Sequence, residues 1–224
     1  ALGYGSLSAN CGNDNTAIGR DALTAFGGGD ATAVGSGAGK SLTSGAANTA
    51  VGYNALDATD DGARNTALGS VALSANCADD NTALGYAALN VFTGSDATAG
   101  GSGALDASVS DVAVTAVGQN ALGVCNGGDY NTAVGKSALL TVDGNNNTAV
   151  GYASLNADCV SDNTAVGKEA LKVFTGSNAT AVGSGAVAAA SSAAGTTAVG
   201  KSALAIVTGE YNTAVGNNAG LVLD

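Results

Sequence analysis

A short phrase recurs thirteen times along the 224 residues and constrains the fold more than any other feature of the sequence. Its core reads Asn-Thr-Ala-Val-Gly-x-x-Ala-Leu, and successive copies lie 16 or 17 residues apart. With the threonine as position 0, position +1 is alanine and position +3 is glycine in every copy. Position +6 is alanine except at Ser154, and position +7 is leucine or valine except at Gly39 and Gly220. A phrase this regular indicates a repeat architecture.

The length of the repeat selects among these architectures. Sixteen residues are too few for a helical repeat or a propeller blade, which need roughly 33 residues or more. The length suits one coil of a solenoid in which short strands pair with their counterparts in the next coil. We therefore predict an all-β parallel β-solenoid of about 14 coils, with strands at Thr-Ala-Val and at Ala-Leu-x-x. The glycine between them is expected at a turn position, where a positive φ or a close approach of the backbone has little cost.

Composition excludes several classes of protein. The chain has no histidine, which rules out Ser-His-Asp and Cys-His catalysis and histidine-ligated zinc. A net charge of −11 argues against nucleic acid as a partner. Because no apolar run reaches 18 residues, we expect no membrane insertion. The repeats fill the sequence, so we predict that residues 1–224 form a single repetitive domain, a fragment of a longer fibre.

The direction of the strand side chains leaves two alternatives open. In a strand, the threonine and the residue at +2 share one face, and the alanine between them faces the other way. If alanine points inward, the coil is thin and an apolar column lies outside, where partner chains would cover it. If the +2 residue points inward, threonine lies inside with it, the alanine column faces out, and a monomer is possible. The oligomeric state depends on this choice.

The phrase resembles the head repeats of trimeric autotransporter adhesins of the YadA type. Asn15–Gly19 and Asn147–Gly151 match the asparagine, alanine, Ile/Val and glycine of that motif. Similar runs occur in tail-fibre-like proteins of phages and viruses, and the resemblance covers nearly the whole chain. It implies a left-handed parallel β-roll that forms a homotrimer through an apolar face. The period is longer here than in the adhesins, and residues 1–224 contain no coiled-coil stalk, neck or membrane anchor.

Two columns are the candidate functional surfaces. The +2 column is the candidate oligomer interface, comprising Ile18, Val34, Val51, Leu68, Leu84, Val117, Val134, Val150, Val166, Val182, Val199 and Val215. The threonine column is the candidate binding ladder, comprising Thr16, Thr32, Thr49, Thr66, Thr82, Thr98, Thr115, Thr132, Thr148, Thr164, Thr180, Thr197 and Thr213. Regular threonine columns on a flat β-face order water in ice-binding proteins. A structural role for the same threonines, as β-formers or turn caps, is the alternative.

Acidic residues recur two positions before the threonine. Stacked carboxylates could share Ca²⁺, a cation that prefers oxygen ligands. The candidates are Asp14, Asp30, Asp80, Asp96 and Asp162. The alternative is that these residues build turns, since Asp tolerates the left-handed conformation. We expect no other metal and no organic cofactor.

Position +4 and the cysteines complete the candidates. Position +4 carries large polar side chains that could contact a receptor or glycan, or form a solvated corner: Tyr4, Arg20, Tyr53, Tyr86, Lys136, Tyr152, Lys168 and Lys201. Cys11, Cys77, Cys125 and Cys159 are too far apart in a solenoid for intrachain disulfides, so we predict partly buried thiols.

The sequence therefore predicts a structural or adhesive segment of an extracellular fibre on a cell or virion surface. We expect a homotrimer that contacts a host surface receptor or glycan. An ice-binding protein that uses the threonine ladder is the alternative. No constellation of catalytic side chains emerges, and we expect no enzymatic activity.

Overall fold

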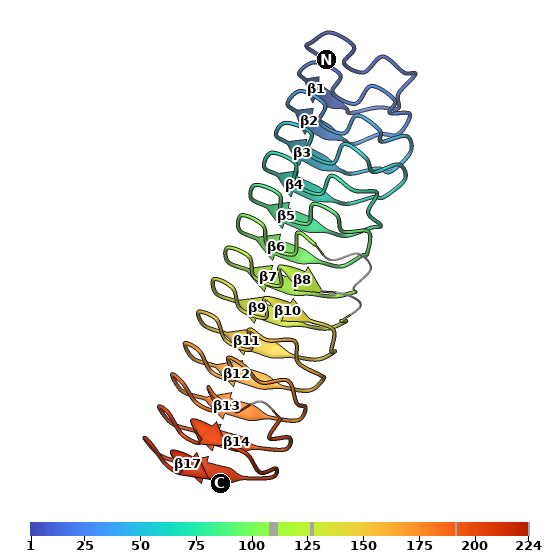
Figure 1. The fold of residues 1–224 in the computed structure, drawn as a ribbon. Helices are drawn as coiled ribbons and strands as arrows, with labels where there is room; N and C mark the ends of the chain where they lie inside the picture. Colours follow the sequence, from blue (N-terminus) through green and yellow to red (C-terminus); the bar gives the residue numbers. More distant parts are fainter. Residues whose placement is uncertain (108–111, 126–127, 191, 224) are drawn as a thin grey trace. The chain divides into compact units, whose positions relative to one another are not determined.

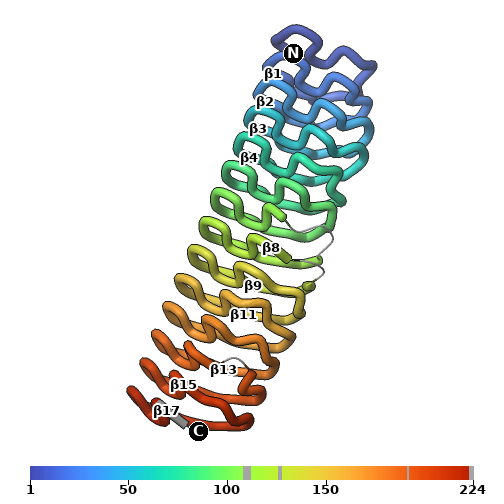
Figure 2. Tube along the Cα trace, viewed as in Figure 1, coloured from blue at the N-terminus to red at the C-terminus, as the bar shows by residue number. Residues whose placement is uncertain are grey.

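The computed structural model describes residues 1–107, 112–125, 128–190 and 192–223 (Figure 1). The chain divides into two compact units, residues 1–113 and residues 114–224, and each is described by itself. In both units the chain winds through successive coils stacked one on the next, as the trace shows (Figure 2). No helix occurs within the described ranges.

Each repeat contributes one three-residue strand to a parallel sheet. In the first unit these are β1 (Thr16–Ile18), β2 (Thr32–Val34), β3 (Thr49–Val51), β4 (Thr66–Leu68), β5 (Thr82–Leu84) and β6 (Thr98–Gly100). In the second they are β7 (Thr115–Val117), β9 (Thr132–Val134), β11 (Thr148–Val150), β12 (Thr164–Val166), β13 (Thr180–Val182), β14 (Thr197–Val199) and β16 (Thr213–Val215). Neighbouring strands within each unit pair in exact repeat register, as where Thr148 lies opposite Thr164.

Two small sheets lie elsewhere in the coils of the second unit. Strand β8 (Val124–Cys125) pairs in parallel with β10 (Thr141–Val142). Strand β15 (Ile206–Val207) pairs in parallel with β17 (Val222–Leu223). The prediction of an all-β parallel β-solenoid with a 16- or 17-residue coil is confirmed. The left-handed sense and the trimer implied by the resemblance stay predictions.

Alanine lines the inside of each coil at two positions. The alanines at +1 and +6 are buried in all coils but the last, as Ala165 and Ala170 illustrate at 0 % exposure. The residue at +7 is buried beside them, and Leu171 is also 0 % exposed. Because two walls of the coil meet across alanine side chains, the interior is too thin for large residues at those positions. The 35 glycines among 224 residues, and the alanine at two positions of nearly every repeat, are thus what a narrow coil requires.

The leucine at +7 does not lie in a strand, contrary to the prediction for Ala-Leu-x-x. Its φ is positive in copy after copy, for example 51° at Leu23 and 52° at Leu171, so the backbone turns there. Non-glycine residues adopt this conformation at a cost. Burial of the leucine and a backbone hydrogen bond to the next coil offset that cost, as where Leu171 N–H donates to Ala186 O at 3.0 Å.

Asparagine occupies position −1 in eight of the thirteen repeats, and six of these side chains are buried inside the coils. The Asn163 side chain donates to Val160 O of its own coil at 3.2 Å and to Gly176 O of the next at 3.0 Å. Its carbonyl oxygen accepts the Ala179 N–H at 2.9 Å. Three hydrogen bonds thus satisfy this buried amide and hold successive coils in register. The residue with positive φ at this corner is the preceding one, at −2, rather than the asparagine itself.

Glycine at +3 allows the coils to approach one another. Gly167 has a φ of +133°, and a Cβ there would lie 2.6 Å from the carbonyl carbon of Gly183 in the next coil. Gly216 has nearly the same φ, +132°, but a Cβ there would meet nothing nearer than Ala219 Cβ at 3.7 Å. The column therefore needs glycine both for its backbone conformation and for coil-to-coil contact.

Variants at these two glycines distinguish the requirement for backbone conformation from the requirement for coil-to-coil contact. Both Gly167→Ala and Gly216→Ala strain the backbone, but Gly167→Ala also forces the coils apart. We expect Gly167→Ala to lower the free energy of unfolding by about 1–3 kcal/mol more than Gly216→Ala, as overpacking does. Urea unfolding followed by circular dichroism measures the difference. Equal losses would show that coil stacking at the glycine column does not limit stability.

Candidate functional site

The outward side of the Thr-Ala-Val strands is the candidate functional site. From β1 to β14 the middle alanine of each Thr-Ala strand is buried while its two neighbours reach solvent, as in β12, where Ala165 lies between half-buried Thr164 and exposed Val166. In β16 the middle alanine, Ala214, is half-buried. The structure thus realises the first of the two alternatives, with alanine inside. We call the surface formed by positions 0 and +2 of each unit the Thr-Val face. All the threonines and aliphatic residues predicted as ladder and interface lie on it.

The Thr-Val face is unusually apolar for an exposed surface. Its aliphatic side chains are well exposed, from 36 % at Val150 to 53 % at Leu84, and reach 72 % at Val215. Val34 and Val51 are half-buried, and Gly100 takes the aliphatic place in β6. Neither column contains a titratable side chain. The face therefore offers methyl groups and hydroxyls at regular spacing and no charge.

The register of the sheet makes this spacing periodic. Each threonine lies directly opposite the threonine of the next strand, as Thr164 lies opposite Thr180. Strands in a sheet are about 4.8 Å apart, and positions 0 and +2 are about 6.6 Å apart along a strand. Within each unit, threonines and aliphatic residues thus form two parallel columns. A periodic surface of this kind suits a partner with matching periodicity.

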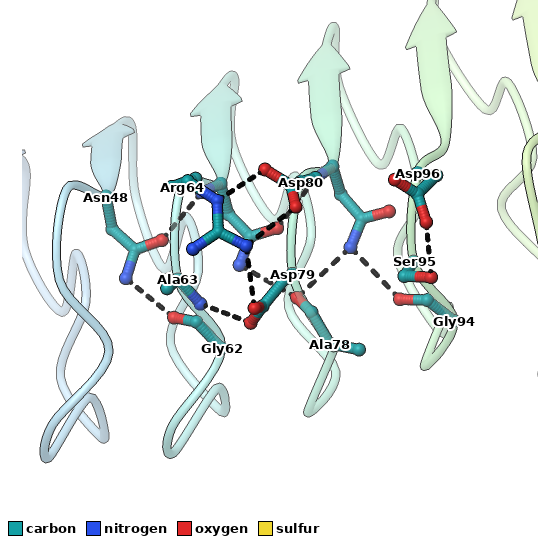
Figure 3. A network of polar contacts seen from close by, with 12 residues as sticks. Asn48, Gly62, Ala63, Arg64, Ala78, Asp79, Asp80, Gly94, Ser95 and Asp96 are labelled. Atoms are coloured by element: carbon teal, nitrogen blue, oxygen red, sulfur yellow. Dashed lines mark hydrogen bonds and ion pairs between the residues drawn. The ribbon is translucent and has the colours of Figure 1, made fainter.

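The face is bordered on one side by the residues that precede each strand. We call positions −3 and −2 the leading edge. At its centre in the first unit, Arg64 bonds to two carboxylates of the next coil (Figure 3). Its guanidinium nitrogens lie 2.8 Å from Asp79 Oδ2 and 2.6 Å from Asp80 Oδ1. The hydrogen bond from the Ala63 N–H is the main cause that lowers the pKa of Asp79, and the Arg64 guanidinium lowers it further. Arg64 also lowers the pKa of Asp80.

The five aspartates predicted as calcium candidates all lie on this edge and are exposed. Each has positive φ, from 58° at Asp96 to 66° at Asp162. Their recurrence is thus explained by the corner, since Asp tolerates this conformation better than most residues. Among the residues that the structure describes, no three His, Cys, Asp or Glu side chains gather closely enough to hold a metal ion. Calcium binding stays a prediction.

The opposite border of the face follows the glycine column. We call position +4 the trailing edge. Its tyrosines are well exposed, at 57 % for Tyr53 and 64 % for Tyr86. Lys136, Lys168 and Lys201 occupy the same column in the second unit and are exposed. Sequence reasoning singled out this edge, but missed that coils with a cation here often carry an acid on the leading edge. The signal was present, for example as Asp162 and Lys168 in one repeat.

The structure describes all four cysteines and joins none of them in a disulfide. Burial raises the pKa of the Cys77 thiol, and it raises the pKa of Cys159 to about 12. Cys125 is also buried, whereas Cys11 is half-buried. Cys159 lines an open hollow of about 250 Å³ with Asp143 and Asp158. Its thiol stays protonated at neutral pH, so this hollow presents no thiolate nucleophile.

Comparison with known proteins gives no relative: no family model matches the chain, and no curated protein or solved structure matches it. Within the described residues, no helix is long and apolar enough to cross a membrane. The resemblance of the repeat phrase to adhesin heads and tail fibres is therefore an expectation that these comparisons do not support.

The cysteines give a direct test of coil packing in solution. Because Cys11 is half-buried and the other three cysteines are buried, we expect Cys11 alone to react quickly with a disulfide reagent at pH 8 in the folded protein. The other three should react after unfolding in urea. Absorbance of the released thiol measures both phases, and Cys11→Ser, the matched control, should abolish the fast one. More than one fast thiol would show that the buried wall of the coils opens readily.

Proposed function

We propose that this chain is a structural segment of an extracellular or virion-surface fibre, and that it associates with copies of itself through the Thr-Val face. The observation that carries the proposal is the outward aliphatic column, whose members are one third to one half exposed in most strands. Soluble monomers rarely expose a continuous apolar patch of this kind. Association with copies of the chain removes the patch from water.

The rest of the surface fits a structural and adhesive role. The solenoid presents long columns of side chains, and its exposed tyrosines and lysines at the trailing edge are suited to contact a receptor or glycan. Aromatic rings and cations are common in such contacts. A homotrimer is the assembly that the repeat phrase suggests by resemblance. We propose no catalytic activity and no required cofactor.

Two valines test the role of the face. Val166 lies on the Thr-Val face and is 36 % exposed, whereas Val173 is 44 % exposed at position +9, away from the face. We expect the native chain to scatter light as a particle of about three times its 21.0 kDa mass. Val166→Lys should yield monomers, because association would bury an unpaired charge. Val173→Lys should keep the native mass. A monomeric native chain would contradict the proposal.

The outward threonine column favours a second candidate, an ice-binding protein. The threonines of each unit face solvent in exact register, so hydroxyl and methyl groups recur at one spacing along each face. Such an array can order water in a regular layer. This function would operate in a monomer, whose face stays open to solvent.

Thermal hysteresis decides the second candidate. If the face binds ice, a dilute solution of the native chain freezes below its melting point. Thr148→Tyr, which places a ring on the face, should abolish most of that gap. Thr208→Tyr, at an exposed position outside the strands, should leave the gap unchanged. No measurable gap in a concentrated native solution would exclude ice binding.

A further inference from the structure

The two edges of the Thr-Val face carry matched charges within single coils of the second unit. The coil of Thr164 has Asp162 on the leading edge and Lys168 on the trailing edge, and both are exposed. The coil of Thr132 has Asp129 on the leading edge and Lys136 on the trailing edge. The intervening coil of Thr148 is neutral on both edges. In these three coils, charged edge residues thus alternate with neutral ones in the same order along both edges.

The last charged coil continues the pattern with a small offset. Lys201 lies on the trailing edge of the coil of Thr197, and Glu210 lies on the leading edge of the next coil. One coil step is about 4.8 Å, which a lysine side chain spans easily. Within the described residues, Lys136, Lys168 and Lys201 form no ion pair, whereas Lys172 bonds to Glu169. Three lysines of one column are therefore available to an outside partner.

The two charges do not pair within one coil. Asp162 precedes and Lys168 follows the three-residue strand β12, and among the described residues no ion pair joins them. The matched charges can therefore meet across a contact between two copies.

Symmetry determines which edges meet. A rotation about an axis parallel to the stack of coils sets the leading edge of one copy against the trailing edge of the next, coil for coil. A rotation about an axis along the strands reverses one copy, and it sets leading edge against leading edge. The first arrangement brings Asp162 to Lys168. The second brings like charges together, which is unfavourable.

The area of the Thr-Val face indicates that a stable contact also includes its two edges. Seven strands at about 4.8 Å make the sheet of the second unit about 34 Å tall, and the three-residue strands are about 10 Å wide. That strip offers about 340 Å², well below the roughly 800 Å² per partner of a stable interface. A stable contact therefore has to extend to the residues on both edges.

Resting on the proposed self-association, we propose that copies of this chain assemble in parallel and in register around an axis along the coil stack. The leading-edge acids of one copy then pair with the trailing-edge lysines of its neighbour. The occupant of the Thr-Val face is thus a second copy of this chain in one defined orientation. The apolar columns supply most of the burial, and the edges select direction and register.

Charge reversal tests the pairing in the full chain. Lys168→Glu and Asp162→Lys each place like charges across the contact, and we expect each to raise the dissociation constant about tenfold or more. The double variant restores opposite charges and should recover native affinity. Glu169→Lys, which changes a half-buried acid outside both edges, is the control for net charge. Sedimentation equilibrium at low and physiological salt measures all four. Equal weakening of the double variant would overturn the pairing.

Cross-linking tests the orientation independently. In a Cys11→Ser background, Thr132→Cys places equivalent thiols of parallel copies near one another, and a short bismaleimide should join them. Val173→Cys, away from the face, should give no such product. Associated chains that fail to cross-link through Thr132→Cys would overturn parallel assembly while leaving self-association standing. A native chain that sediments as a monomer would instead overturn the proposed function, so the two failures are distinguishable.

Discussion

Backbone contact between adjacent coils is the constraint on which the structure depends. Coils spaced at strand distance bring glycine onto glycine and alanine onto alanine, and Gly167 leaves no room for a Cβ against Gly183. The same closeness lets Asn163 reach carbonyl groups of two coils and lets the Leu171 N–H find Ala186 O. A thin interior then expels the large side chains at positions 0 and +2 to the outside. The exposed apolar face is thus a consequence of tight stacking.

Much of the fold could be predicted because the same sequence pattern occurs thirteen times at nearly constant spacing. The period predicted a β-solenoid, the invariant glycine predicted a turn position with a positive φ or a close approach of the backbone, and Thr-Ala-Val predicted the strands. The Ala-Leu segment was predicted wrongly as a strand. Leucine has no intrinsic preference for the left-handed conformation seen at Leu171. Burial and the bond between coils impose it there, and neither is visible in a single repeat.

The candidate site was predictable in its membership but not in its orientation. Strand periodicity placed Thr164 and Val166 on one side, but either side could have been the interior. The width of the coil interior determines which side faces inward. That width depends on how closely the two walls of the coil meet across Ala165 and Ala170. The aspartates differ in this respect. Their recurrence suggested metal ligands, and the φ of 66° at Asp162 adds a conformational reason for aspartate at that corner, which the repeat phrase did not reveal.

Three coils contain a buried phenylalanine, and in them a single residue cannot be exchanged without its neighbour. Phe174 is completely buried, and its ring lies 2.7 Å from where a Cβ on Gly176 would be. Phe26 and Gly28 stand in the same relation, with a separation of 2.8 Å. A ring that fills its neighbour's side-chain space can be inherited only together with the glycine that makes the space. The phenylalanine and the glycine therefore have to be duplicated together, which explains why Val-Phe-Thr-Gly occurs unchanged at residues 91–94 and 173–176.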